Sequence, residues 1–326
     1  MRSFAVRTYD VDAPLECLDV PIPQPDPGEV RIRIEATALG FVDGLMMRGR
    51  YQIKPPLPYV PGGEIAGIVD AVGDGVTGVR VGERVVTWQL GGGLADYVVV
   101  PAADIDVLDE GLSAATAASM LVDYQTAHHG LFDRGQVGSA DTVLVLGAAG
   151  GVGAAAVQMA ARTGATVIAA ASSAEKREFA HTLGARHTID YLAADWRAEL
   201  KAKAPHQVVD VVFDPVGGEM LEPAFRSLGK AGRYLVVGFA AGRVPSLPVN
   251  LALLKSATLL GVEIRHFLHT EPDRAKRVRT ALFDQVKTGA LHAPKTVKFP
   301  IEQAAAALLA TTGRTRVGKV VVEVNS

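Results

Sequence analysis

Glycine residues and their backbone amides, rather than a reactive side chain, give this chain its clearest potential for chemistry. Seven consecutive positions contain four glycines, namely Gly147, Gly150, Gly151 and Gly153. They follow the apolar run 142–146, TVLVL, and precede a stretch rich in alanine. Glycine permits a sharp turn and brings backbone N–H groups against a phosphate at the positive end of a helix. The pattern predicts a dinucleotide-binding turn, and a tight turn without a ligand is the alternative. The expected contacts are Ala149, Gly150, Gly151 and Val152.

The end of the next predicted strand, Thr166–Ala171, indicates which dinucleotide binds. In NAD sites an Asp or Glu about twenty residues after the glycines holds the ribose 2′-hydroxyl. Here the strand ends without an acid, and hydroxyl groups with a cation favour a 2′-phosphate. We therefore predict that the cofactor is NADPH and that Ser172 and Lys176 bind its 2′-phosphate. Arg177 is a further candidate for this contact, after these two residues. Two alternatives stay open: Lys176 and Arg177 are solvated residues of the next helix, or Glu175 turns in and favours NAD.

The sequence around this turn alternates between predicted strands and helices. The strands are expected at 142–146, 166–171, 187–189, 208–213, 233–238 and 258–264. Helices are expected between them, for example at 174–183 and 195–203. Six strands joined by crossover helices predict a doubly wound parallel sheet, which binds its cofactor where the strand order reverses.

The first part of the chain has a different pattern, with many Pro and Gly residues and short strands. The run 30–35, VRIRIE, alternates strictly, as a strand with one solvated face does. Further strands are predicted at 64–72, 83–88 and 95–100. After residue 265 two helices, 272–288 and 301–312, and a strand, 319–324, are expected to rejoin this part. We therefore predict one domain from residues 1–120 and 265–326, and a dinucleotide-binding domain from residues 121–264.

Length, composition and charge restrict the function further. A chain of 326 residues exceeds what one core usually fills, and 48% hydrophobic with 21% charged residues is typical of a globular protein. The net charge of −2 gives no general attraction to nucleic acid or to anionic membranes. Cys17 is the only cysteine, which favours a reducing compartment. With no signal core and no long apolar run, we expect a soluble, cytoplasmic protein without nucleic-acid or membrane partners.

Several motifs together carry a family resemblance over the whole chain. They are ALGFVDGLMMRGRY at 38–51, LPYVPGGEIAG at 57–67, VGERV at 81–85, QTA at 125–127, IDY at 189–191, DVVFDPVGG at 210–218 and GK at 318–319. In this order they resemble the medium-chain dehydrogenase/reductase superfamily, and most closely its zinc-free quinone oxidoreductase (zeta-crystallin-like) branch. The resemblance implies an α/β protein in which a GroES-like β-rich catalytic domain accompanies a Rossmann domain, with the active site in a cleft between them.

The resemblance also implies how the chain assembles. Members of the family commonly pair their Rossmann sheets edge to edge, and the strand predicted at 258–264 is the expected edge here. An exposed apolar edge is prone to aggregation unless it is covered. We therefore expect a homodimer formed through the Rossmann edge strands.

Metal binding is not expected. Zinc enzymes of the superfamily use an early Cys, a His and a later Cys or Asp, and the matching positions fall near Phe41, at Gly63 and near Val122. None of them is Cys or His, whereas catalytic zinc needs three side-chain ligands. His128 and His129 are adjacent, so on a helix they point about 100° apart and form no chelating pair.

Without a Lewis acid, alcohol oxidation is difficult, because nothing stabilises the alkoxide. Hydride addition to a quinone or an α,β-unsaturated carbonyl is easier, since the acceptor has its own electron sink. The chain then has to bind NADPH, orient the small-molecule acceptor and stabilise the developing enolate with hydrogen bonds.

By resemblance, the residues of the catalytic cleft are Asp43, Arg48, Tyr51, Thr126, Phe239 and Arg314. Tyr51 is the preferred proton donor or orienting group, unless it is a core aromatic. Asp43 either acts in the cleft or braces a loop with Arg48.

Further cofactor contacts are implied by the resemblance. Thr126 is expected at the nicotinamide, Tyr191 near the adenosine 2′-phosphate, and Gly238 with Phe239 at the end of the fifth strand. Lys319 contacts the cofactor or caps the last strand.

The acceptor pocket departs from the family at Phe41, where the branch usually has Asn. The amide of that Asn helps to fix the nicotinamide or the acceptor, whereas Phe41 forms no hydrogen bond through its side chain. This suggests a more apolar acceptor pocket. Met47, with Met46, would suit such a pocket or belong to the core.

Three functions agree with these residues. The first is an NADPH-dependent, zinc-free reductase of quinones or related electrophilic carbonyls. The second is an enoyl-thioester or enone (2-alkenal) reductase, for which Arg48, Arg50 and Lys54 would bind the phosphates of a CoA or carrier. The third is a weakly catalytic NADPH-binding sensor or partner protein.

Overall fold

In the computed structural model, which describes residues 1–10, 13–313 and 316–324, the chain forms two compact units. The first unit comprises Met1–Val122 with Ala293–Ser326, and the second comprises Asp123–His292. The expected division placed residues 265–292 with the first unit. They belong to the second, because helix α10 (Pro272–Lys287) packs on α3 (Asp123–His128) and α9 (Ile264–Thr270).

The first unit is built on a mixed sheet, as the strand-rich sequence predicts. The order along the sheet is β14–β15–β3–β4–β5–β7, and β6 also pairs with β3. The strands are β3 Glu29–Leu39, β4 Glu64–Val72, β5 Arg84–Trp88, β6 Tyr97–Pro101, β7 Ile105–Val107, β14 Thr296–Pro300 and β15 Lys319–Glu323. Separately, β1 (Arg2–Ala5) and β2 (Glu16–Asp19) form an antiparallel pair.

Alternation along β3 explains how this sheet forms a core. Val30, Ile32 and Ile34 are fully buried, whereas the intervening residues are half-buried. The same core includes residues of α1 Phe41–Met47, α11 Ala304–Thr312 and the 3₁₀ turns η1 Ala102–Asp104 and η5 Ile301–Gln303. Helix α2 Ala114–Met120 also contacts β3 and β4. The helix expected at 301–312 therefore begins as a 3₁₀ turn.

The second unit contains the predicted doubly wound sheet, in the order β10–β9–β8–β11–β12–β13, with every pair parallel. The strands are β8 Thr142–Leu146, β9 Thr166–Ala170, β10 His187–Ile189, β11 Val209–Asp214, β12 Leu228–Val236 and β13 Thr258–Gly261. The strand order reverses between β8 and β11, which is where such sheets bind their ligands. The predicted last strand, 258–264, is too long, since the chain leaves the sheet after Gly261 and α9 begins at Ile264.

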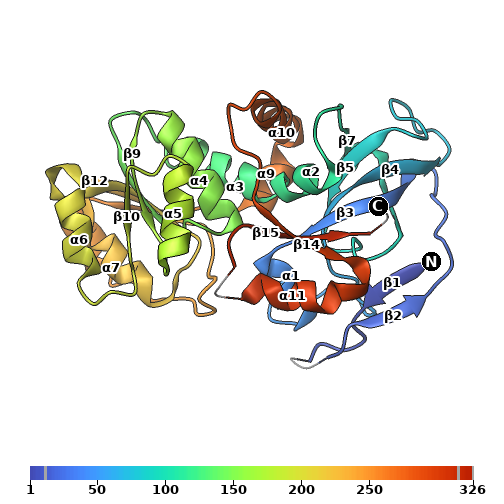
Figure 1. Ribbon diagram of the computed structural model, residues 1–326, viewed down its shortest axis with the longest axis horizontal. Helices are drawn as coiled ribbons and strands as arrows, with labels where there is room; N and C mark the ends of the chain where they lie inside the picture. Colours follow the sequence, from blue (N-terminus) through green and yellow to red (C-terminus); the bar gives the residue numbers. More distant parts are fainter. Residues whose placement is uncertain (11–12, 314–315, 325–326) are drawn as a thin grey trace. The chain divides into compact units, whose positions relative to one another are not determined.

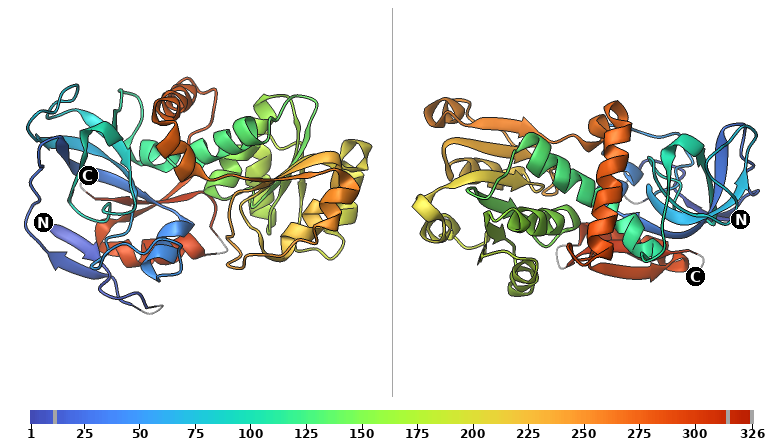
Figure 2. Two further views of the ribbon diagram at one scale, coloured as in Figure 1. Left: turned by 180° about the vertical axis from the view of Figure 1, so that it is seen from behind. Right: turned by 90° about the horizontal axis from the view of Figure 1, so that it is seen from above.

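Helices cover both faces of this sheet. On one face lie α4 (Gly151–Arg162) and α5 (Ala174–Thr182), in front of the sheet in Figure 1. On the other lie α6 (Trp196–Lys203), α7 (Leu221–Phe225) and α8 (Asn250–Lys255), as the view from behind in Figure 2 shows. Right-handed crossovers require this arrangement.

The remaining turns are the π-helical His129–Arg134 and the 3₁₀ turns Pro205–Gln207 and Gly218–Met220. No helix in the described part of the chain is long and apolar enough to cross a membrane.

Candidate cofactor site and active site

The glycine-rich turn connects the buried strand β8 to helix α4. Gly147 has a φ of +59°, and Gly150, in extended conformation, is the N-cap of α4 without a side-chain cap. A Cβ at Gly153 would lie 2.3 Å from the carbonyl oxygen of Gly147, so no other residue fits there without a shift of the turn. At Gly150 the nearest such atom is 3.4 Å away. The turn therefore leaves the positive N-terminal end of a twelve-residue helix open at Gly150.

Asp123, at the start of α3, explains the glycine at position 151. A Cβ on Gly151 would lie only 1.8 Å from Oδ2 of Asp123, so the carboxylate packs against the backbone of the first turn of α4. The glycine-rich pattern at 147–153 includes Gly151 but gives no sign of this contact. A carboxylate beside a helix N-terminus is favourable to the helix dipole.

Thr126 lies on α3 in a setting suited to a ligand. Its hydroxyl is buried and has no hydrogen-bond partner in the described structure. The helix is fixed by Tyr124, whose hydroxyl donates to the carbonyl of His292 at 2.6 Å and accepts from Nε2 of Gln158 at 2.9 Å. A buried hydroxyl without a partner is costly unless a ligand satisfies it, which agrees with the predicted contact to a nicotinamide.

The residues after β9, Ser172, Ser173, Glu175, Lys176 and Arg177, have different roles. Ser173 caps α5, since its hydroxyl accepts from the backbone N–H of Lys176 at 3.3 Å. Arg177 forms an ion pair with Asp190 at 2.8 Å and also donates to the carbonyl of Ala171, so it is not available in reserve for a phosphate. Ser172 and Lys176 are half-buried at the strand end. Glu175 is exposed in the first turn of α5.

The loop after β11 is held by Asp214, a residue that was not among the predicted site residues. Its buried carboxylate accepts from the hydroxyl of Tyr234 at 2.6 Å and from the backbone N–H groups of Val216 and Gly217, each at 2.8 Å. Burial raises the pKa of Asp214, although these hydrogen bonds oppose the rise. The only sequence signal is the family motif at 210–218, which does not specify the hydroxyl partner.

Three other predicted contacts lie near strand ends of the same unit. Phe239 packs over Gly217, where a Cβ would lie 2.8 Å from its ring, and Gly238 precedes it. Tyr191 packs against the apolar core beneath β10.

In the first unit, Asp43 has the bracing role that the sequence analysis allowed, but its partners are not those expected. Its buried carboxylate accepts from the backbone N–H groups of Gly40 at 2.7 Å and Gly62 at 2.9 Å. Burial raises its pKa, while the same N–H groups and the charge of Lys319 oppose the rise. The expected pairing with Arg48 is wrong, because Arg48 donates to the carbonyl of Gly44 at 2.9 Å.

Lys319 is buried and forms an ion pair with Glu64, with 2.6 Å between Nζ and Oε1. The other carboxylate oxygen of Glu64 accepts from the backbone N–H of Val122 at 3.1 Å. This geometry favours a structural role for Lys319 over direct contact with a cofactor, because its amine is already bound inside the unit.

The residues predicted for the acceptor pocket and the catalytic cleft of the first unit differ in their burial. Met47 and Met46 are buried in the hydrophobic core, which is the alternative that the sequence left open for them. Tyr51 packs half-buried against the same core. Phe41 is the half-buried first residue of α1. Arg314 lies outside the described residues.

By the family resemblance, the zinc-ligand positions fall near Phe41 and Val42, at Gly63 and near Val122, beside Asp123, and none of them is Cys or His. At Gly63 a Cβ would lie 1.9 Å from the carbonyl oxygen of Gln89, so the backbone leaves no room for a histidine. The described residues include no group of three or more His, Cys, Asp or Glu side chains placed to bind a metal ion.

Comparison with known proteins agrees with this architecture. The family described as "Alcohol dehydrogenase GroES-like domain" matches residues 26–109, and "Zinc-binding dehydrogenase" matches residues 151–278. Mouse quinone oxidoreductase-like protein 2 is 32% identical over 320 residues, which is 98% of this chain and 91% of the mouse protein.

Two solved structures are also similar. The quinone oxidoreductase from Thermus thermophilus, solved also as its complex with NADPH, is 32% identical, with a TM-score of 0.84 and coverage of 99% of this chain and 100% of that one. CurK enoyl reductase is 26% identical, with a TM-score of 0.88 and coverage of 99% of both chains.

A GroES-like unit followed by a Rossmann-type unit defines a class of oxidoreductases. The chain belongs to the medium-chain dehydrogenase/reductase superfamily, as one of its quinone oxidoreductase-like proteins.

Proposed function

We propose that this protein is a zinc-independent reductase that transfers hydride from NADPH to a quinone or a related electrophilic carbonyl. The observation that carries the proposal is the open N-terminus of α4 at Gly150, combined with a β9 end that has Ser172 and Lys176 but no acid. The helix end suits a diphosphate, and hydroxyl groups with an amine suit a 2′-phosphate. The NADPH complex of the Thermus relative supports the same cofactor.

Zinc independence is supported by the donor set. By resemblance the ligand positions fall near the apolar Phe41 and near Val122, which Asp123 follows, and at Gly63, where the backbone has no space for a side chain. Catalytic zinc requires three protein ligands and an open position. These residues do not fit the metal, although the family name includes zinc binding.

The proposed chemistry assigns limited tasks to the chain. NADPH, when bound, supplies the hydride. Thr126 offers its unpartnered hydroxyl to the nicotinamide, which orients the ring. Tyr51 is proposed to donate a hydrogen bond or the proton to the reduced acceptor, and Phe41 to present an apolar surface to it. Positioning and hydrogen bonding to the developing enolate then supply the catalysis.

The acceptor is identified by NADPH oxidation with a simple quinone, an alkyl enone and crotonyl-CoA, assayed in parallel. Rapid turnover of the quinone supports the proposal. Turnover of the enone or thioester alone favours the second candidate, an enoyl reductase, which the likeness to CurK enoyl reductase supports. Tight NADPH binding without any turnover would leave a sensor or binding protein.

Cofactor preference is tested by Lys176→Gln, with Arg177→Gln as the matched control. If Lys176 binds the 2′-phosphate, its loss weakens NADPH binding about tenfold or more and leaves NADH unchanged, because one charge-assisted hydrogen bond is removed. Arg177 pairs with Asp190, so its variant keeps the preference for NADPH. Equal effects of the two variants would contradict the assignment.

We also propose a homodimer through the edge of the Rossmann sheet. Strand β13 is the edge strand, and its Leu259 is 48% exposed. The neighbouring segment presents further apolar side chains to solvent, which are Val244, Val249, Leu253 and Leu254. An apolar edge of this kind is typical of a surface covered by a partner.

A further inference from the structure

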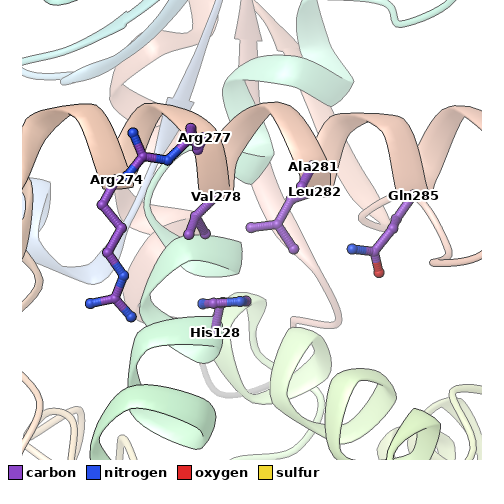
Figure 3. Close-up of a pocket in the computed structure, with 7 residues that line it drawn as sticks. All are labelled: His128, Arg274, Arg277, Val278, Ala281, Leu282 and Gln285. Carbon is purple, nitrogen blue, oxygen red and sulfur yellow. The ribbon is translucent and has the colours of Figure 1, made fainter.

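A cavity in the Rossmann-type unit lies between α3 and α10, and none of the proposed cofactor contacts lines it. Its volume is about 210 Å³. Seven residues line it, namely His128, Arg274, Arg277, Val278, Ala281, Leu282 and Gln285. Figure 3 shows the imidazole of His128 below α10, with Val278 above it and the side chain of Arg274 reaching down to the same level.

His128 is set up to offer one hydrogen-bond donor. Its Nδ1 atom is buried and has no partner in the described structure. Burial lowers the pKa of His128, and the charges of Arg274 and His129 add to this while Asp133 opposes it, so the ring is neutral at neutral pH. A proton on Nδ1 would be a buried donor without an acceptor, which costs more than a bare lone pair. The proton therefore resides on Nε2.

The two arginines of the cavity differ in how far they are neutralised. Arg274 is bound by two carboxylates, Asp133 and Glu271. Arg277 forms no ion pair or hydrogen bond with any residue that the structure describes. Among the described residues Arg277 is thus the lining cation without an ion pair, although Asp273 and Asp284 line a neighbouring pocket with it, and a single such cation suits a monoanion better than a dianion. The carboxamide of Gln285 adds neutral donor and acceptor groups.

The remainder of the lining is apolar, because Val278, Ala281 and Leu282 face the same cavity. A volume of 210 Å³ is below the range of about 300–1,000 Å³ typical of sites for drug-sized ligands. The occupant is therefore smaller than a nucleotide, with one anionic end and an apolar body.

We propose that this cavity binds a small organic monocarboxylate, with the carboxylate on the guanidinium of Arg277 and the apolar body against Val278, Leu282 and the ring of His128. A guanidinium matches a carboxylate in geometry and charge. The proposal does not depend on the proposed reductase activity.

Calorimetric titration of the full chain with benzoate, without NADPH, tests this site. Benzamide has the same shape without the charge, and inorganic phosphate has charge without an apolar body. We expect benzoate to bind at least tenfold more tightly than either compound, because only benzoate matches both parts of the lining. Equal binding of benzamide, stronger binding of phosphate or no binding of benzoate overturns the proposal.

Two variants locate the binding. Arg277→Gln should weaken benzoate about tenfold or more, as expected for a lost charge-assisted hydrogen bond. The matched control is Lys276→Gln, which removes the same charge from the same helix outside this cavity and should leave the affinity within about twofold. Similar losses in both variants would show general electrostatic attraction and overturn the site. Unchanged thermal melting in both confirms that each variant folds.

Discussion

At the residue scale, the buried carboxylates are placed by backbone amides that the sequence does not reveal. The sequence correctly predicts that Asp43 could brace a loop, yet it names Arg48 as partner, whereas the partners are the N–H groups of Gly40 and Gly62. Asp214 is similar, because its partner Tyr234 is twenty positions further along the chain, on the adjacent strand. Residue types can be read from a sequence, but such partners depend on strand pairing and register.

Tyr234→Phe should destabilise the fold in a pH-dependent way. The hydroxyl of Tyr234 lowers the pKa of Asp214, so its loss raises that folded-state pKa further. An acid whose pKa is raised in the folded state stabilises the fold at pH values below its usual pKa of 3.8. This contribution is lost as the pH increases through the folded-state pKa. We expect a loss of about 1.5–3 kcal/mol at neutral pH and a smaller loss near pH 4, measured by urea unfolding.

Tyr124→Phe is the control for that prediction. Its hydroxyl donates to the neutral carbonyl of His292, so its loss should cost stability equally at both pH values. A pH-independent effect of Tyr234→Phe would contradict the coupling to Asp214.

Lys319→Met should leave Glu64 as a buried, unpaired charge. We expect a loss of about 3–5 kcal/mol in the free energy of unfolding. The double variant Glu64→Gln/Lys319→Met should recover most of it, because the amide oxygen of Gln still accepts from Val122. Unchanged stability with weakened NADPH binding would instead favour the cofactor contact that the family resemblance suggests for Lys319.

At the element scale, the strands around the glycine-rich turn could be predicted closely. Strand β8 has the predicted bounds. All its residues are buried, and a parallel strand buried on both faces is recognised in a sequence as a continuous run of β-branched and leucine residues. The end of β13 could not be predicted, because Val262 and Ile264 are as apolar as the strand before them. Glu263 decides the boundary: its side chain accepts from the N–H of His266 and caps α9.

Two alanine substitutions separate the structural and ligand-binding roles of the turn. Gly153→Ala places a Cβ against the carbonyl of Gly147 and should cost about 1–3 kcal/mol of stability. Gly150→Ala has room, with its nearest contact at 3.4 Å, so stability should change by less than about 1 kcal/mol.

The variants Gly153→Ala and Gly150→Ala also test where the diphosphate of the cofactor binds. If the diphosphate binds at the open end of α4, Gly150→Ala should weaken NADPH binding, because the new methyl group lies at that end. Measuring unfolding and NADPH affinity for both variants distinguishes these roles. Unaltered NADPH affinity in Gly150→Ala would place the diphosphate elsewhere.

At the scale of the whole molecule, the sequence predicts two units of the correct types but assigns α10 to the wrong one. Its amphipathic pattern shows that one face is buried, but not against which partner. The contact is made by α3 and α9, and Arg274 also pairs with Asp133, in the π-helical turn that follows α3, and stacks on Phe267 of α9. Long-range packing of this kind is not encoded in local periodicity.

Leu253→Glu tests the proposed dimer. Leu253 is 80% exposed on α8, so a charge at this position should leave the fold intact. In the dimer interface the same charge would be buried without a partner, so the protein should shift from dimer to monomer. Light scattering after size-exclusion chromatography measures the mass. Leu309→Glu, on an exposed side of α11 in the other unit, is the control and should remain dimeric. A monomeric wild-type protein would contradict the proposal.

The most direct test of the central claim is the steady-state oxidation of NADPH with a simple quinone by chelator-treated, metal-free protein. If Phe41, Gly63 and Val122 leave no zinc site, the metal-free protein should turn over, and added Zn²⁺ should not increase the rate. Turnover that appears only after Zn²⁺ is restored, or that proceeds with NADH and not with NADPH, would contradict the account.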